Sequence, residues 1–226
     1  MYKRQDVDAI IYLGDGRFHL EAIMIANPDV PAFRYDPYSK KFTRERYDHA
    51  LMRSVRGNAV RTARGTIEQY VSDPSDKTTS VFMDRPLWGV VLGTLGRQGS
   101  FKQLQVRRLE MFERLLIDMY QAITNQLATS RTEIPYMPIL LSELSPAKLS
   151  LFAPHISTFV QTSCPRLSID WGYAFNTPLL SPYETRAAIG DDPAWMTGSV
   201  KEKTVYPMDF YEAGTPWAIS RAKGTF

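Results

Sequence analysis

From residue 87 onward, apolar segments of strand length alternate with segments of helical length. The expected strands and helices are, in chain order, residues 87–92, 101–127, 137–141, 145–152 and 157–162. A strand–helix–strand order predicts parallel strands joined by right-handed crossover connections. We therefore expect an α/β fold with a parallel sheet, in which ligands bind beyond the carboxyl ends of the strands.

The region before residue 65 shows a shorter form of the same alternation. Residues 9–13 are apolar and predict a parallel strand that is buried on both faces. The segments 18–26, 32–35 and 44–64 predict a helix, a strand and a helix, although Gly57 weakens the middle of the last one. This region therefore resembles the end of a second, related α/β unit.

The remaining segments carry weaker patterns. Residues 65–85 are polar and predict a surface insertion or linker. Residues 182–189 predict a helix, and the residues from 191 onward, with scattered proline, glycine and aromatic side chains, predict a loosely structured tail. Because the first predicted strand starts abruptly, we expect that residues 1–5 are not native sequence.

The composition excludes several classes of protein. The 27 basic and 24 acidic residues give a net charge of +3, which is far from the charge typical of nucleic-acid binding. The single cysteine excludes a disulfide framework and fits a reducing compartment. No apolar run approaches the roughly 20 residues of a membrane span, and no secretory leader is recognisable. We expect a cytoplasmic protein without nucleic-acid or membrane partners.

Four polar or glycine-rich loops follow predicted strands, at residues 14–21, 93–99, 142–146 and 163–166. If all these strands are parallel, the four loops meet at the carboxyl edge of the sheet. In the first loop, Gly14 and Gly16 allow a sharp turn, while Asp15, Arg17 and His19 supply an acceptor, a fork of donors and a titratable ring. The alternative is an ordinary glycine-rich turn with capping polar groups.

The second loop, residues 93–99, opens a predicted helix. Its free N–H groups, with Gly96 and Gln98 among its members, are suited to a carboxylate or phosphate. The spacing is neither the dinucleotide fingerprint nor a P-loop, and many such loops are only tight turns. An unrelated nucleotide-binding domain that uses this loop stays a competing interpretation.

Each of the last two loops can be interpreted in two ways, as a structural feature or as part of a functional site. Ser145 is a predicted N-cap before Pro146, which leaves Glu143 either at a strand end or in the cleft. Cys164 ends an apolar strand before a Pro-Arg turn and a short polar segment, and is either a ligand or a small buried apolar residue. His49 and His155 read as ordinary surface or packing residues. No spacing predicts a self-contained zinc site or a serine hydrolase elbow.

These loops belong to longer motifs that resemble the eukaryotic subunit-1 family of 2-(3-amino-3-carboxypropyl)histidine synthases, which begin diphthamide biosynthesis. The motifs are residues 12–27, 35–39, 92–100, 141–143, 164–172, 178–184 and 207–211. The resemblance implies three similar α/β domains, each with one cysteine ligand of a [4Fe-4S] cluster. Cys164 matches the cysteine of the third domain. We accordingly expect a fragment: residues 1–85 end the middle domain, residues 86–190 form the third domain, and residues 191–226 are a tail.

The resemblance also implies the chemistry of the parent enzyme. The cluster binds S-adenosylmethionine, and its 3-amino-3-carboxypropyl group is transferred by radical chemistry to the imidazole C2 of a histidine in elongation factor 2. The family suggests a heterodimer with a second subunit and a small iron-binding electron donor. A fragment with one cysteine is expected to be inactive alone, and a non-catalytic supporting subunit is the alternative.

The candidate site residues follow from this resemblance together with their chemistry. Cys164 is the expected metal ligand. The expected cofactor-binding residues for S-adenosylmethionine or the target imidazole are Asp15, Gly16, Arg17, His19, Gly96 and Gln98. Asp170 is expected to orient the loop around the cluster.

Overall fold

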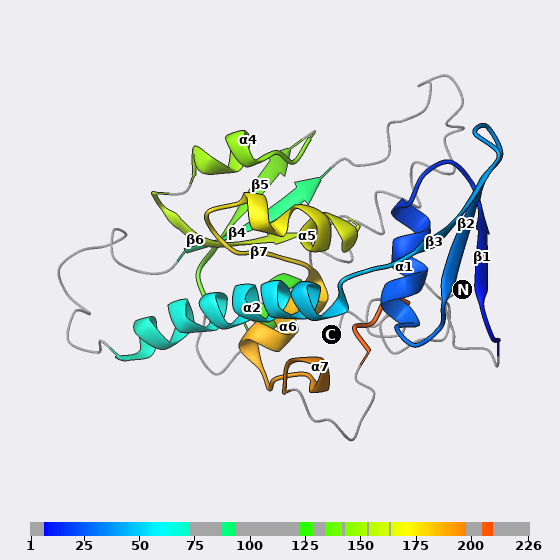
Figure 1. The fold of residues 1–226 in the computed structure, drawn as a ribbon. Helices are drawn as coiled ribbons and strands as arrows, with labels where there is room; N and C mark the ends of the chain where they lie inside the picture. Colours follow the sequence, from blue (N-terminus) through cyan, green and yellow to red (C-terminus); the bar gives the residue numbers. More distant parts are fainter. Residues whose placement is uncertain are drawn as a thin grey trace, which may run out of the picture. The chain divides into compact units, whose positions relative to one another are not determined.

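The computed structural model describes residues 7–72, 87–93, 123–128, 134–141, 143–152, 154–162, 164–197 and 205–209 (Figure 1). The chain divides into two compact units. The first unit contains residues 1–54 and 193–218, and the second contains residues 55–192 and 219–226. Each unit has its own sheet with parallel strands, which confirms the expected α/β class. The domain boundaries expected at residues 85 and 190 stay predictions.

The first unit is built on a three-stranded sheet in the order β1 (Ile10–Leu13), β2 (Ala32–Asp36) and β3 (Lys41–Glu45). Helix α1 (Phe18–Ala26) connects β1 to β2, which are parallel as predicted. Strand β3, which the sequence did not predict, returns antiparallel to β2. Its turn is held by the Asp36 carboxylate, which accepts hydrogen bonds from the Tyr38 and Ser39 amides.

Only one face of this sheet is covered among the described residues. On that face, Leu20 and Met24 of α1 pack against Ala32, with Ile10 and Tyr12 beside them. On the other face, Ile11 and Leu13 are 69% and 71% exposed. The prediction that the first strand is buried on both faces is therefore wrong for the described part of the chain.

Helix α2 (His49–Ser72) starts later and ends later than predicted. The Asp48 carboxylate accepts a hydrogen bond from the Leu51 amide at 2.9 Å and caps the helix, so a start at residue 44 is wrong. The predicted linker is wrong for residues 65–72, which continue the helix. There the Thr66 hydroxyl accepts a hydrogen bond from the indole of Trp88, which is buried. Residues 73–86 lie outside the described part.

The second unit contains a four-stranded parallel sheet in the order β5-β4-β6-β7 (Figure 1). Its strands are β4 (Leu87–Gly93), β5 (Tyr136–Leu141), β6 (Ile156–Gln161) and β7 (Leu179–Leu180), so the three predicted strands are confirmed and β7 is additional. The core joins Val91, Ile139 and Phe159 from the three long strands with Leu149, Ile156 and Leu179. Burial on both faces accounts for the apolar runs of β4 and β6, whereas β5 exposes alternate residues, among them Leu140 at 78%.

Short helices surround this sheet. Helix α4 (Pro146–Ser150) begins at Ser145, whose hydroxyl accepts a hydrogen bond from the Lys148 amide, as predicted. Helix α6 (Pro182–Ile189) has the predicted bounds and a complete capping box between Ser181 and Glu184. The Pro-Arg turn expected after Cys164 is confirmed, because the Leu167 amide donates to the Cys164 carbonyl at 2.9 Å. The short polar segment expected after this turn is wrong, because those residues form helix α5 (Arg166–Trp171) and the 3₁₀ turn η3 (Gly172–Ala174).

Two further predictions are tested only in part. Residues 123–128 are helical, and the rest of the long helix expected over residues 101–127 lies outside the described part. In the first unit, α7 (Ala194–Thr197) lies in the expected loose tail, and Trp195 packs on the buried Tyr206 with ring centroids 5.0 Å apart. The tail prediction is thus wrong at these residues. No helix in the described ranges has the length and apolar character of a membrane span.

Candidate functional site

The carboxyl edge of the second unit's sheet carries Cys164. Strand β6 ends at Gln161, and Thr162 fixes the chain beyond it, because both its amide and its hydroxyl donate to the Val91 carbonyl of β4 at 3.1 Å. Thr162 is 1% exposed. The segment that carries the cysteine therefore begins at a residue that is hydrogen-bonded to β4.

The turn that holds Cys164 is closed by hydrogen bonds on its carbonyl oxygen. The Leu167 amide donates to it at 2.9 Å, and the side-chain amide of Gln161 donates to it at 3.1 Å. The same Gln161 nitrogen lies 3.1 Å from the Ser168 hydroxyl. This arrangement joins β6 to α5 around the cysteine.

The Cys164 thiol is partly buried, and burial raises its pKa above the ordinary value for a cysteine. The negative charge of Asp170 acts in the same direction. The backbone amide and the positive charge of Arg166 act in the opposite direction. A thiol with a raised pKa keeps its proton near neutral pH, so binding to a metal would have to displace that proton.

Helix α5 carries an ion pair beside the cysteine. The Arg166 guanidinium binds both carboxylate oxygens of Asp170, with distances of 3.0 Å from Nε and 2.8 Å from Nη2. Arg166 is 2% exposed. Asp170 therefore fixes Arg166 within α5, and the orientation of a cluster loop by Asp170 stays a prediction.

The loop after β5, residues 142–146, supports the structural interpretation, in which Glu143 only marks the end of a strand. The Glu143 side chain is 79% exposed, and its carboxylate lies 3.4 Å from the Lys148 ammonium group. It is thus placed at the surface rather than in a cleft. His155 is exposed, whereas His49, in the first unit, is half-buried, packs edge-on against Tyr47, and has a pKa lowered by burial and by Arg53.

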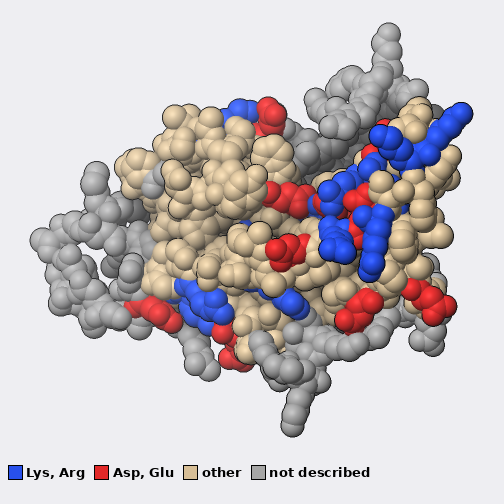
Figure 2. Space-filling model, in the orientation of Figure 1, with Lys and Arg blue, Asp and Glu red and all other residues tan. Residues whose placement is uncertain are grey.

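The glycine-rich loop belongs to the first unit, where its arginine is engaged in ion pairs. Arg17 lies 3.3 Å from the Glu21 carboxylate and 3.2 Å from that of Glu45. Arg34 binds the other oxygen of Glu45 at 3.1 Å and donates to the Asp15 carbonyl at 2.6 Å. Figure 2 shows acidic and basic side chains interleaved on this unit. The network fixes the loop to β2 and β3.

The remaining members of this loop face solvent. Asp15, Gly16 and His19 are exposed, and the His19 ring stacks edge-on against Phe18 at 5.4 Å. A Cβ atom at Gly14 would lie 2.8 Å from the Tyr12 ring, whereas one at Gly16 would meet nothing within 4 Å. Close approach of the backbone therefore accounts for the glycine at Gly14 alone.

The four predicted loops do not share one edge. The loops after β5 and β6 lie on the sheet of the second unit, while the Gly14 loop lies on the separate sheet of the first unit. Gly96 and Gln98 lie outside the described residues. Within the described ranges, no group of three histidine, cysteine or acidic side chains is arranged to hold a metal. The expectation of a single edge is wrong because the strands belong to two sheets.

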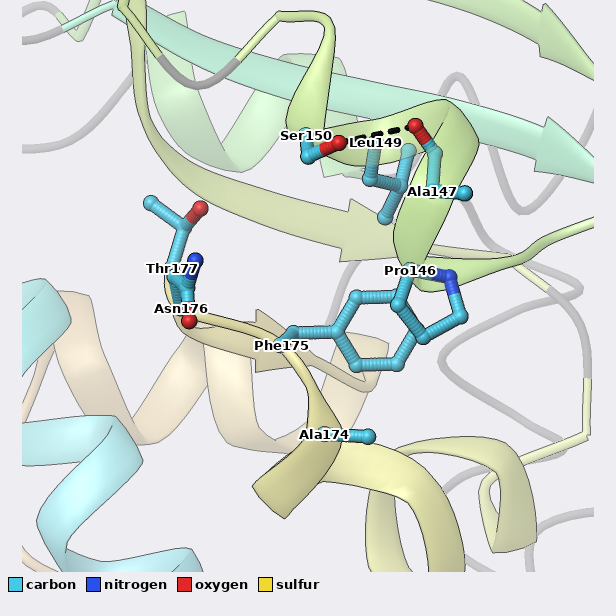
Figure 3. Close-up of a pocket in the computed structure, with 8 residues that line it drawn as sticks. All are labelled: Pro146, Ala147, Leu149, Ser150, Ala174, Phe175, Asn176 and Thr177. Atoms are coloured by element: carbon cyan, nitrogen blue, oxygen red, sulfur yellow. Dashed lines mark hydrogen bonds between the residues drawn. The ribbon is translucent and has the colours of Figure 1, made fainter.

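A pocket of about 230 Å³ also lies in the second unit (Figure 3). It is lined by Pro146, Ala147, Leu149, Ser150, Ala174, Phe175, Asn176 and Thr177. Figure 3 shows the hydrogen bond in which the Ser150 hydroxyl donates to the Ala147 carbonyl at 2.8 Å. The lining contains no charged side chain and none of the predicted site residues.

Sequence reasoning missed the residues that build the cysteine turn. The sequence pattern places Gln161 and Thr162 at the end of an apolar strand. A usable signal exists: an amide side chain in a strand otherwise suited to burial needs internal hydrogen-bond partners, and the following turn is the nearest source. The ion pair between Arg34 and Glu45 could not be expected either, because Glu45 lies in β3, a strand that the sequence did not predict.

Together, the fold and the site define an α/β protein with a lone cysteine in a fixed turn at the carboxyl edge of a parallel sheet. The family described as "Putative diphthamide synthesis protein" matches residues 1–72 and 76–200. The chain belongs to this family.

Curated relatives agree with the family match. The chain is 43% identical over 221 residues to the human protein named 2-(3-amino-3-carboxypropyl)histidine synthase subunit 1, covering 97% of this chain and 40% of the human one. The chicken and Candida albicans proteins of that name are 44% and 42% identical, over 96% and 92% of this chain and 42% and 38% of theirs. The chain thus spans about two fifths of the length of these relatives.

A crystal structure of Dph2 from Pyrococcus horikoshii with a 4Fe-4S cluster aligns with a TM-score of 0.45 at 19% identity, over 83% of this chain and 42% of that one. A second crystal structure of the same protein aligns with a TM-score of 0.44 at 20% identity, over 80% and 41%.

Proposed function

We propose that this chain is the part of a 2-(3-amino-3-carboxypropyl)histidine synthase subunit 1 that supplies one cysteine ligand in the first step of diphthamide biosynthesis. In this step a 3-amino-3-carboxypropyl group passes from S-adenosylmethionine to a histidine of elongation factor 2. The observation that carries the proposal is the position of Cys164, the only cysteine of the chain, in a bonded turn at the carboxyl edge of β6. The names of the relatives supply the product chemistry.

The residues of this chain fit a [4Fe-4S] cluster as a partial donor set. Cys164 has a half-buried sulfur, and the positive charge of the neighbouring Arg166 favours its thiolate form. One thiolate is not enough, since such clusters are held mainly by several cysteines. When bound, the cluster supplies the electron that cleaves the bond between the sulfur and the methionine γ-carbon of S-adenosylmethionine. The other ligands would come from outside this chain, in keeping with the fragment hypothesis.

Other residues are assigned to binding and positioning. Asp15 and His19 present exposed polar groups in the same loop as Gly16 and Arg17. This loop would bind the amino and carboxylate groups of S-adenosylmethionine or orient the target imidazole. Gly96 and Gln98 belong to the loop after β4, where backbone amides would receive the methionine carboxylate. Asp170 would keep Arg166 oriented beside the cysteine.

The proposal includes the wider assembly that the family resemblance suggests. The parent protein would act in the cytoplasm as a heterodimer with the second synthase subunit and receive electrons from a small iron-binding protein. Residues 1–85 would then end the middle domain, and residues 86–190 would form the third. The relatives are named subunit 1, which favours the catalytic over the supporting subunit.

The test uses the full-length parent protein, co-expressed with its partner subunit and purified without oxygen. Iron content and methylthioadenosine release are measured for the wild type, for Cys164→Ser, and for His155→Ala as a control. His155 is exposed at the opposite end of β6. We expect Cys164→Ser to lose iron and turnover, while the control keeps both. Retention of both by Cys164→Ser would make the cysteine a packing residue and overturn the proposal.

A further inference from the structure

One buried polar side chain next to the cysteine turn is not explained by packing. Gln161 is fully buried at the last position of β6, where every other residue of the strand except Ser157 is buried as well. An amide placed in such surroundings costs stability unless its hydrogen bonds are made inside the protein. Its partners therefore indicate what the side chain is for.

Two acceptors of the Gln161 side chain belong to the segment that carries the cysteine. Its Nε2 atom lies 3.1 Å from the Cys164 carbonyl oxygen and 3.1 Å from the Ser168 hydroxyl, which is itself fully buried. The first contact holds the turn, and the second holds the first turn of α5. One side chain thus ties the strand to both parts of the segment that follows it.

The adjacent Thr162 completes the restraint on the side of the sheet. Its amide and hydroxyl both donate to the Val91 carbonyl, so the chain cannot slide along β4 while these bonds persist. The Leu167 amide donates to the Cys164 carbonyl at 2.9 Å, which gives that oxygen two donors. The backbone of Cys164 is therefore fixed from three directions.

We infer that Gln161 is a positioning residue that holds the Cys164 turn in the geometry required of a metal ligand. The inference rests on the function proposed above, because only ligand duty makes the direction of the sulfur matter. Gln161 acts on the cysteine through its backbone carbonyl, to which the side-chain amide donates. Supporting groups of this kind determine whether a ligand is held at its productive position.

A matched pair of substitutions separates positioning from general stability. Gln161→Leu removes both hydrogen bonds, whereas Ser168→Ala removes only the bond to α5 and leaves the bond to Cys164. The rate of Cys164 alkylation by iodoacetamide is measured on the chain without metal at one fixed pH, beside the thermal midpoint of each variant. We expect alkylation to accelerate about tenfold in Gln161→Leu and to stay unchanged in Ser168→Ala. Equal rates in the wild type and Gln161→Leu, or equal acceleration in both variants, would overturn the inference.

A measurement on the wild type serves if Gln161→Leu does not fold. Hydrogen exchange of the Leu167 amide reports the turn directly, since this amide donates to the Cys164 carbonyl. We expect it to be protected as strongly as the amides within β6. Exchange as fast as in an exposed loop would show that the turn is not held, and the role of Gln161 would be withdrawn.

The purified heterodimer of full-length subunits provides a readout beyond activity. We expect the electron paramagnetic resonance spectrum of the reduced enzyme to change in Gln161→Leu and to stay as in the wild type in Ser168→Ala. An unchanged spectrum in Gln161→Leu would argue against positioning. The two proposals fail separately: iron retained by Cys164→Ser overturns the cluster assignment, whereas unchanged alkylation in Gln161→Leu overturns the role of Gln161 at any iron content.

Discussion

Arg56 of α2 and Glu184 of α6 form a buried, bidentate ion pair across 128 positions of sequence. The distances are 2.7 Å from Nε to one carboxylate oxygen and 2.8 Å from Nη2 to the other. Arg56 also donates to the Leu179 carbonyl at 2.7 Å, and Glu184 accepts a hydrogen bond from the Ser181 amide at 2.9 Å. A Cβ atom at Gly172 would collide with the guanidinium. Residues 178–184, singled out as a motif, are therefore explained by the anchoring of α2 to β7 and α6.

Removal of one partner of this pair is expected to be strongly destabilising. Arg56→Met leaves the Glu184 carboxylate buried without its guanidinium, which costs about 3–5 kcal/mol of the free energy of unfolding. Lys148→Met is the matched control, because its pair with Glu143 is exposed and worth about 0–1 kcal/mol. Urea unfolding followed by circular dichroism measures both. A loss below about 1 kcal/mol in Arg56→Met would contradict the buried pair.

Two glycines predict opposite effects of the same substitution. A Cβ atom at Gly89 in β4 would lie 2.9 Å from side-chain atoms of both Ile139 and Phe159, so Gly89→Ala overpacks the core and costs about 1–3 kcal/mol. Gly65 lies within α2 with nothing near its Cβ position, so Gly65→Ala stabilises by about 0.5–1 kcal/mol. Thermal unfolding of the two variants should shift the midpoint in opposite directions. If both variants shifted the thermal midpoint in the same direction, the packing described around Gly89 or around Gly65 would be wrong.

The parallel sheet of the second unit was predictable because its strands are apolar on both faces. The runs at β4, β5 and β6 admit few other structures, and the cap at Ser145 follows from one residue before a proline. The start of α2 was not predictable in the same way. The helical spacing begins at Tyr47, but pairing of β3 with β2 extends to Glu45 and the Asp48 carboxylate caps the helix, so the start lies later than predicted.

The candidate site shows the same division. Cys164 could be placed at a strand end from the sequence, and its own motif led to the family. The helix that follows Cys164 could not be predicted from the sequence, because α5 has only six residues. It is stabilised by the Arg166–Asp170 ion pair and by the hydrogen bond between Gln161 and Ser168. Such contacts depend on tertiary neighbours. The separation of the Gly14 loop onto a second sheet was hidden for the same reason, because strand order does not state which strands pair.

The carboxylates of Glu45 and Asp36 give a prediction about acid. The Thr43 hydroxyl donates to Glu45 at 2.7 Å and lowers its pKa most strongly, with Arg34 and Arg17 helping, and the Ser39 hydroxyl does the same for Asp36. A lowered folded pKa means that the stabilisation is present above the unfolded value, about 4 for these groups, and is lost as the pH falls through the folded value.

The two hydroxyls can be removed separately. In carbon-detected NMR titrations, we expect Thr43→Val to raise the pKa of Glu45 and leave that of Asp36 in place. Ser39→Ala should do the reverse. Each variant is thus the control for the other. A common shift of both carboxylates would point to a general change of the unit and contradict local hydroxyl bonds as the cause.

The thiol of Cys164 gives a prediction about alkaline pH. Burial raises its pKa, so the folded chain favours the protonated thiol. The stabilisation is complete below the unfolded value of about 8.5 and is lost as the pH rises through the folded value. The rate of iodoacetamide alkylation should therefore reach its midpoint at a higher pH in the folded chain than in concentrated urea. Asp170→Asn removes a charge that contributes to the shift, and should lower the midpoint of the folded chain while leaving the urea value unchanged. A folded midpoint at or below that of the unfolded chain would show that Arg166 and its amide outweigh burial at this cysteine.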